Sequence, residues 1–244
     1  MDTTNNTLKS FSYLGGLVAL GMVLSALIFS VSFYVSRDNN SSLSVTGSAK
    51  KEVEADRVRW SLSLTRTVDE SQINAGYQSL AKDLVAVKQL FSQSGVAEDE
   101  YTSSPVYMDQ VYKQNDYANR EYILRQIIEV NSPKVAEISA LAKNVQVLAS
   151  QGVLFQSMPL EYTYSKLAEA RIELLADAMR DAKERANQIA QSGGSQVGDL
   201  QSAASGVVQV LSPGSISVDD YGAYDTQSLK KEIMVTVRAS FMLE

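Results

Sequence analysis

Hydrophobic residues follow three patterns along the chain, and each pattern predicts one kind of element. The first is an apolar run over 10–36 that contains no charged residue and is bracketed by Lys9 and Arg37. A helix rises about 1.5 Å per residue, so roughly 20 apolar residues cross the hydrocarbon core of a bilayer. The run predicts one transmembrane helix over 10–36, a short cytoplasmic head over 1–9 and a linker over 37–42.

An uncleaved signal-anchor and a cleaved signal peptide both fit this run. A signal peptide here would have only Lys9 in its n-region, an unusually long apolar core, and bulky Phe33 and Tyr34 at its exit. These features favour an anchor. The charges flanking the run are nearly balanced, so charge alone does not orient the helix.

The second pattern is strict alternation of apolar and polar residues, which is typical of strands with one wet face. It occurs over 58–64, and again over 233–243 at the end of the chain. A long hairpin is predicted over 102–130, with a polar tip at 113–119. Gly47, in the first predicted strand, indicates a bulge or a close approach of another backbone.

The third pattern has the period of an amphipathic helix and predicts three helices. The first follows Asp69, which with Gln72 resembles a capping box. The second is expected to begin at Ser132-Pro133, and the third is expected to be capped by Ser165. One face of the third helix, rich in small residues, is expected to pack closely on a sheet: Leu175, Ala178, Met179, Ala182, Ala186 and Ile189.

Together these elements predict an α+β body over 43–244. It is mainly antiparallel sheet with long helices, in the order ββαββ-αβαββ, and is preceded by the single transmembrane helix. The helix at residues 73–91 could pair with another chain, but its stripe is expected to cover the protein's own sheet. Two hundred residues allow one large domain or two small interlocked ones.

The amino-acid composition excludes several kinds of binding partner, nucleophile and metal site. The chain has 22 Lys and Arg against 28 Asp and Glu, a net charge of −6, which argues against nucleic acid as the main partner. It contains no cysteine and no histidine. Disulfides, thiol nucleophiles, thiolate metal sites, histidine triads and histidine-ligated zinc are therefore excluded. No cofactor and no metal are expected.

The remaining candidates for catalysis are acidic clusters and one Ser–Lys pair, Ser165 with Lys166. The densest cluster is the run over 98–100, followed by Asp219 and Asp220. A carboxylate hydrolase needs two acids flanking a substrate at a set separation, which adjacency in sequence does not supply. Ser165 is explained by a helix cap, and the aspartates over 219–225 match no ordered calcium loop. We predict no catalytic residue and expect a protein that is not an enzyme.

Tyrosines gather in two exposed segments and are the candidates for oligomer contacts. The hairpin tip carries Tyr112 and Tyr117, and the long loop over 212–228 carries Asp219, Tyr221 and Tyr224. Tyrosine adds interface area at low entropic cost, and a loop of this length is functional, disordered or part of a subunit contact. The alternative for the hairpin is that these are ordinary strand tyrosines.

The body resembles the SIMPL-domain family, which includes the YggE-like periplasmic proteins. The opening SVTGSAKKEVEADRV is similar to the family's first motif, with Gly47 and Asp56 on its glycine and aspartate, although Ala55 stands where proline is usual. The stretch SKLAEARIELLADAMRDAKERANQIAQSGG matches the family's long helix. The resemblance implies an exported α/β body outside the cytoplasmic membrane, ring- or cage-like oligomers in some members, and an association with oxidative or envelope stress. It implies no catalytic residues.

Two function hypotheses follow. The first is a non-enzymatic scaffold, a homo-oligomer anchored in the bacterial inner membrane by a single span, with its C-terminal domain in the periplasm and an unknown envelope partner. The alternative is a periplasmic binding module that holds a small ligand or an envelope component in a cleft lined by aromatic residues.

Overall fold

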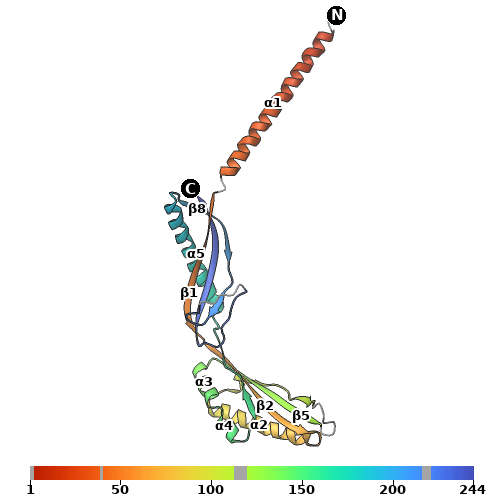
Figure 1. The fold of residues 1–244 in the computed structure, drawn as a ribbon, viewed down its shortest axis with the longest axis vertical. Helices are drawn as coiled ribbons and strands as arrows, with labels where there is room; N and C mark the ends of the chain where they lie inside the picture. The colour runs from red at the N-terminus through yellow and green to blue at the C-terminus, as the bar shows by residue number, and fades with distance from the viewer. Residues whose placement is uncertain (1–2, 39–40, 113–119, 216–220) are drawn as a thin grey trace. The chain divides into compact units, whose positions relative to one another are not determined.

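The computed structural model describes residues 3–38, 41–112, 120–215 and 221–244 (Figure 1). Its helices and short 3-10 turns are α1 (Thr3–Asp38), η1 (Glu70–Gln72), α2 (Ile73–Gln93), η2 (Glu98–Glu100), α3 (Val135–Lys143), α4 (Val147–Ser150) and α5 (Leu167–Ser192). Its strands are β1 (Ser42–Glu54), β2 (Arg57–Asp69), β3 (Tyr101–Ser103), β4 (Tyr107–Val111), β5 (Glu121–Ser132), β6 (Phe155–Ser157), β7 (Glu161–Thr163), β8 (Val197–Ser205), β9 (Gln209–Leu211) and β10 (Lys230–Leu243). The predicted α+β class is confirmed.

Helix α1 contains the apolar run expected from the sequence. Its segment Gly15–Tyr34 has a mean hydropathy of 2.2 and is not buried by any other part of the structure. The segment is long and apolar enough to cross a membrane. A signal sequence meets the same criteria, so the structure shows an N-terminal apolar helix that could span a membrane, whereas its insertion and retention as an anchor stay predictions.

The larger sheet has the strand order β3-β5-β2-β6, with β4 also paired to β5 and β7 to β2. All of its pairings are antiparallel, and β2 runs beside β5 from Val58↔Ser132 to Asp69↔Glu121. The alternation predicted over 58–64 is confirmed, because Val58, Trp60, Leu62 and Leu64 are all buried. They pack with residues of α2, α3 and α4 in one core.

The smaller sheet has the order β1-β10-β8, with β9 also paired to β10. The last strand confirms its predicted period, since Ile233, Val235, Val237, Ala239 and Phe241 are buried. Because β10 lies in the middle, β1, β8 and β9 are outer strands of this sheet, each paired among the described strands with β10 alone.

The chain forms two compact units. Unit 1 consists of 1–48, 178–205 and 237–244, and unit 2 of 49–177 and 206–236. Unit 1 has a small core of Val45, Ala182, Ala186, Ala239 and Phe241. Unit 2 holds the large core of the six-stranded sheet and a second cluster around Leu174, Ile233 and Val235. Strands β1 and β10 and helix α5 contribute residues to both units.

The predicted helix starts need correction. No side-chain hydrogen bond caps η1 or α2, so the capping box expected at Asp69 is absent from this part of the described chain. Helix α3 begins at Val135, two residues after Pro133, although the Ser132 hydroxyl accepts a hydrogen bond from the Lys134 N–H at 3.0 Å. Helix α5 begins at Leu167, so Ser165 lies two residues before it instead of at the position next to it, and the Ser165 hydroxyl donates to Asp56 Oδ2 at 2.6 Å.

The alanine face of α5 is confirmed with one exception. Ala178, Ala182 and Ala186 are fully buried, but Ile189 is 52% exposed. The helical period places Ala190 on the buried side in its stead, at 4% exposure. The helix ends in a turn at Gly194, whose φ of 76° suits glycine.

Candidate functional site

Strand β1 is fixed against helix α5 by a glycine. A Cβ added to Gly47 would lie 2.2 Å from the Ala178 carbonyl oxygen and 2.4 Å from the Ala182 nitrogen. No larger residue fits there unless the two backbones separate. The close backbone approach predicted at Gly47 is therefore confirmed, and small residues are required on both sides of the contact.

The outer edge of β1 is protected by side chains. The Ser48 N–H donates to Asp181 Oδ2 at 2.8 Å, and Arg185 Nε donates to the same oxygen at 2.9 Å. The bonds from Arg185 and from Ser48 lower the pKa of Asp181 and keep it an acceptor. Farther along the strand, Lys50 pairs with Glu232 and Lys51 with Glu173. Charged side chains of this kind discourage pairing with another strand.

Strand β8, on the opposite side of β10, has no such side-chain bond to its backbone over Asp199–Ala204 within the described parts of the chain. Asp199 through Ser205 are exposed, and Leu200 is 48% exposed. Asp199 is the only charged residue in the strand. Among the described residues, no strand other than β10 pairs with β8. Two register shifts, near Gln201 and near 198–199, leave a regular stretch over Ser202–Ser205.

The register shows which backbone groups of β8 face outward. The Gly206 N–H donates to the Thr236 carbonyl, so that pair is hydrogen-bonded. Hydrogen-bonded and non-hydrogen-bonded pairs alternate in an antiparallel ladder. The pair Ala204↔Arg238 is therefore hydrogen-bonded, and Ala203↔Ala239 is not. Consequently the N–H and C=O of Ala203 point away from β10 and toward the open edge.

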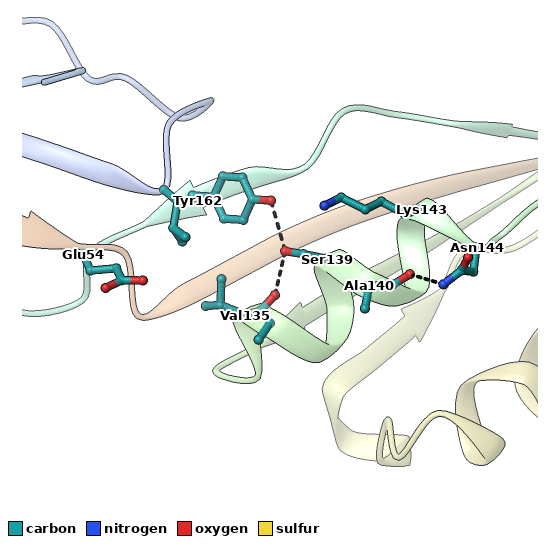
Figure 2. A pocket seen from close by; sticks show the side chains of 9 residues that line it. Glu54, Val135, Ser139, Ala140, Lys143, Asn144 and Tyr162 are labelled. Atoms are coloured by element: carbon teal, nitrogen blue, oxygen red, sulfur yellow. Dashed lines mark hydrogen bonds between the residues drawn. The ribbon is translucent and has the colours of Figure 1, made fainter.

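Unit 2 contains a groove of about 600 Å³ beside Tyr162 (Figure 2). Helix α3 and Asn144, directly after it, form one wall, and Glu54 at the end of β1, Tyr162 on β7 and Leu229 complete the lining. Glu54 lies at one end of the groove and Lys143 at the other (Figure 2). Ser139 and Tyr162 lie between these two charges, with their oxygens 3.0 Å apart.

A buried lysine holds the C-terminal end of the long loop over 212–228. Lys231 is fully buried, and its ammonium group donates to the carbonyls of Asp225 and Ser228. Burial lowers the pKa of Lys231, an effect that the charge of Asp225 partly opposes. The Tyr224 ring lies 5.8 Å from the ammonium nitrogen, and the Tyr224 hydroxyl accepts from the Tyr164 N–H. Sequence reasoning missed Lys231, because its neighbours in β10 resemble an ordinary half-wet strand.

The tyrosines predicted as oligomer contacts lie on different sheets. Tyr112 directly follows β4 of the larger sheet and is 88% exposed. Tyr224 forms a bridge to Val210 in β9, which belongs to the smaller sheet, and Tyr221 is 95% exposed. Tyr117 and Asp219 lie outside the described residues. Contact of any of these residues with a second copy stays a prediction.

The acidic cluster over 98–100 has a structural use. Glu100 accepts hydrogen bonds from the Ala97 N–H, the Ser132 hydroxyl and the Lys134 ammonium group. The Ala97 bond is the main cause of a lowered pKa at Glu100. Within the described parts of the chain, no group of three His, Cys, Asp or Glu residues is placed to hold a metal ion.

Comparison with known proteins identifies the family. The SIMPL family model, described as "Protein of unknown function (DUF541)", matches residues 43–241. The chain belongs to the SIMPL family. No curated protein matches it. The family resemblance inferred from Gly47, Asp56 and the long helix is therefore confirmed, while the likeness to YggE-like periplasmic members stays a prediction.

Proposed function

We propose that this SIMPL protein is a membrane-anchored, non-enzymatic scaffold that self-assembles in the bacterial periplasm, with β8 as one of its contact surfaces. The observation that carries the proposal is the open edge of β8. An exposed strand edge presents unpaired N–H and C=O groups that pair readily with a strand of another chain. The family resemblance adds a role in envelope or oxidative stress tolerance to the proposal.

A second copy of β8 suits this edge. Two β8 strands can pair in antiparallel orientation about a two-fold axis, so that each copy offers the same surface. Asp199 lies outside the regular stretch over Ser202–Ser205, so no like charges face each other in a pair centred on that stretch. Alanine and serine over 202–204 allow close approach, and Leu200 adds apolar area.

Anchoring by the membrane helix would allow a contact of only a few backbone hydrogen bonds to hold two copies together. A few backbone hydrogen bonds contribute only about 0.5–1.5 kcal/mol each, which is weak for free proteins in dilute solution. Tethering by α1 would confine the copies to one membrane and raise their effective concentration. β1 begins at Ser42, four residues after α1 ends, so unit 1 is the part of the body joined directly to the anchor.

The test uses the full-length protein in mild detergent, with its mass measured by light scattering. Ala203→Pro removes the outward N–H without removing a ladder bond to β10, because Ala203 is not in a hydrogen-bonded pair. Ala203→Val is the matched control, since it keeps the N–H and favours a strand. We expect the wild type and Ala203→Val to assemble. We expect Ala203→Pro to associate at least about tenfold more weakly than either.

Two results would contradict the proposal at different levels. A wild type that stays monomeric would refute self-assembly. Equal assembly of the proline and valine variants would refute β8 as the contact surface and direct attention to the exposed tyrosines. Intact mass spectrometry on the same preparation shows whether residues 1–36 are retained, which the anchor requires.

A further inference from the structure

The groove beside Tyr162 has opposite charges at its two ends. The Glu54 carboxylate and the Lys143 ammonium group both border it, and neither makes an ion pair or side-chain hydrogen bond with any described residue. Several other charged side chains of unit 2, among them Lys50, Lys51 and Arg59, are paired. The groove therefore offers one anionic and one cationic group that the fold does not use.

The centre of the groove offers a hydrogen-bond acceptor. The Ser139 hydroxyl has one proton, which it donates to the Val135 carbonyl at 2.6 Å. The contact between Ser139 and Tyr162 must then be donated by the Tyr162 hydroxyl. This leaves the lone pairs of the Tyr162 oxygen to accept from a third group. Figure 2 shows that oxygen lying between the Glu54 and Lys143 ends of the groove.

The remaining walls are mostly apolar. Val135, Ala136, Ala140 and Leu229 contribute small or medium apolar side chains. Asn144 also lines the groove, and its side-chain amide donates to the Ala140 carbonyl at 3.0 Å. The volume falls within the range of roughly 300–1,000 Å³ that is usual for small-molecule sites, and a few converging polar groups set orientation in such sites. Small apolar substituents suit these walls.

We propose that this groove binds a dipeptide with small apolar side chains in its zwitterionic form. The free amino group would pair with Glu54, the peptide N–H would donate to the Tyr162 oxygen, and the terminal carboxylate would pair with Lys143. A free amino acid carries both charges but lacks the central N–H donor. The inference goes beyond the assembly function and is independent of the β8 edge.

The experiment is isothermal titration calorimetry on the full-length protein in mild detergent, with L-Ala-L-Ala as the probe. We expect the wild type to bind it, and to bind N-acetyl-Ala-Ala, Ala-Ala-amide and free alanine at least about tenfold more weakly. Each of these compounds lacks one of the three groups that the groove recognises. No heat of binding with L-Ala-L-Ala at millimolar concentration would overturn the proposal.

Charge-removing variants assign each end of the ligand. Glu54→Gln should weaken L-Ala-L-Ala binding at least about tenfold and abolish the preference over the N-acetyl compound, while Lys143→Gln should abolish the preference over the amide. Both side chains are exposed, so neither change is expected to unfold the chain. Glu52→Gln and Lys88→Gln make the same charge changes on exposed residues outside the groove and should leave binding unchanged. Binding that is equal in all four variants would overturn the assignment.

Discussion

The core of unit 1 and the large core of unit 2 join a helix to an antiparallel sheet in opposite ways. In unit 1, Gly47 and the buried alanines of α5 bring two backbones into contact. In unit 2, large side chains such as Trp60, Phe91 and Leu62 fill the space between sheet and helices. The difference shows where each core is vulnerable: unit 1 to added atoms, and unit 2 to removed atoms.

Phe91→Ala should have the largest effect on stability. Phe91 is fully buried, and its ring centre lies 6.0 Å from that of Trp60 and 5.2 Å from that of Tyr101. Truncation leaves a cavity and should lower the free energy of unfolding by about 3–5 kcal/mol. Urea unfolding of the full-length protein in detergent measures it, with the fluorescence of Trp60, the only tryptophan, as the signal. Tyr77→Ala, at a 39% exposed position of the same helix, is the control. It should lower the free energy of unfolding much less than Phe91→Ala.

Gly47→Ala should lower the free energy of unfolding by about 3 kcal/mol, the upper end for overpacking, because backbone atoms are the obstacle. Amide hydrogen exchange of the unit 1 part of α5 measures the effect. Gly193→Ala is the matched control, since its added Cβ would meet the Ala190 oxygen at an ordinary 3.5 Å. Equal exchange in the two variants would mean that β1 can move away from α5 at little cost.

Asp56→Asn should have a smaller effect that depends on pH. Burial alone would raise the pKa of Asp56, but the hydroxyl and N–H of Ser165 donate to the carboxylate and lower the pKa below its ordinary 3.8. This stabilisation is present above the ordinary pKa and is lost as the pH falls through the lower folded value. The variant should be less stable by about 1 kcal/mol at pH 7, and this difference should vanish once the pH has fallen below the folded pKa of Asp56.

Urea midpoints measured from pH 2 to pH 7 test this sign. Ser165→Ala, which removes the hydroxyl donor but leaves the N–H, should reproduce part of the effect. A difference between Asp56→Asn and the wild type that stays constant over the whole range would show that the Asp56 charge is not the stabilising feature.

Local pattern was enough to predict most elements of the fold. The alternation over 58–64 and in β10, the glycine contact at Gly47 and the alanine face of α5 all appear as short-range periodicities or single residues. Errors arose where a partner is distant in sequence. Ser165 has the appearance of a helix cap, but its hydroxyl is bonded to Asp56, 109 residues earlier.

The candidate sites were harder to predict from the sequence, again because their parts are distant along the chain. The open edge of β8 depends on β10, the last strand, lying between β8 and β1, and no local pattern encodes that order. The groove joins Glu54, helix α3 and Tyr162 from three separate elements. Aromatic composition drew attention to the exposed tyrosines, whereas the groove uses Tyr162, which is half-buried and donates inward to Ser139.

The sealed edge of β1 limits how far the smaller sheet can grow. In the language of polymer chemistry, a sheet with two open edges is a bifunctional monomer and propagates into a fibre, whereas a sheet with one is monofunctional and terminates after a single coupling. Under the proposed β8 contact, the Asp181 carboxylate on the Ser48 N–H and the flanking lysine pairs would place this protein in the second class. An assembly of more than two copies would then require a further contact through another surface.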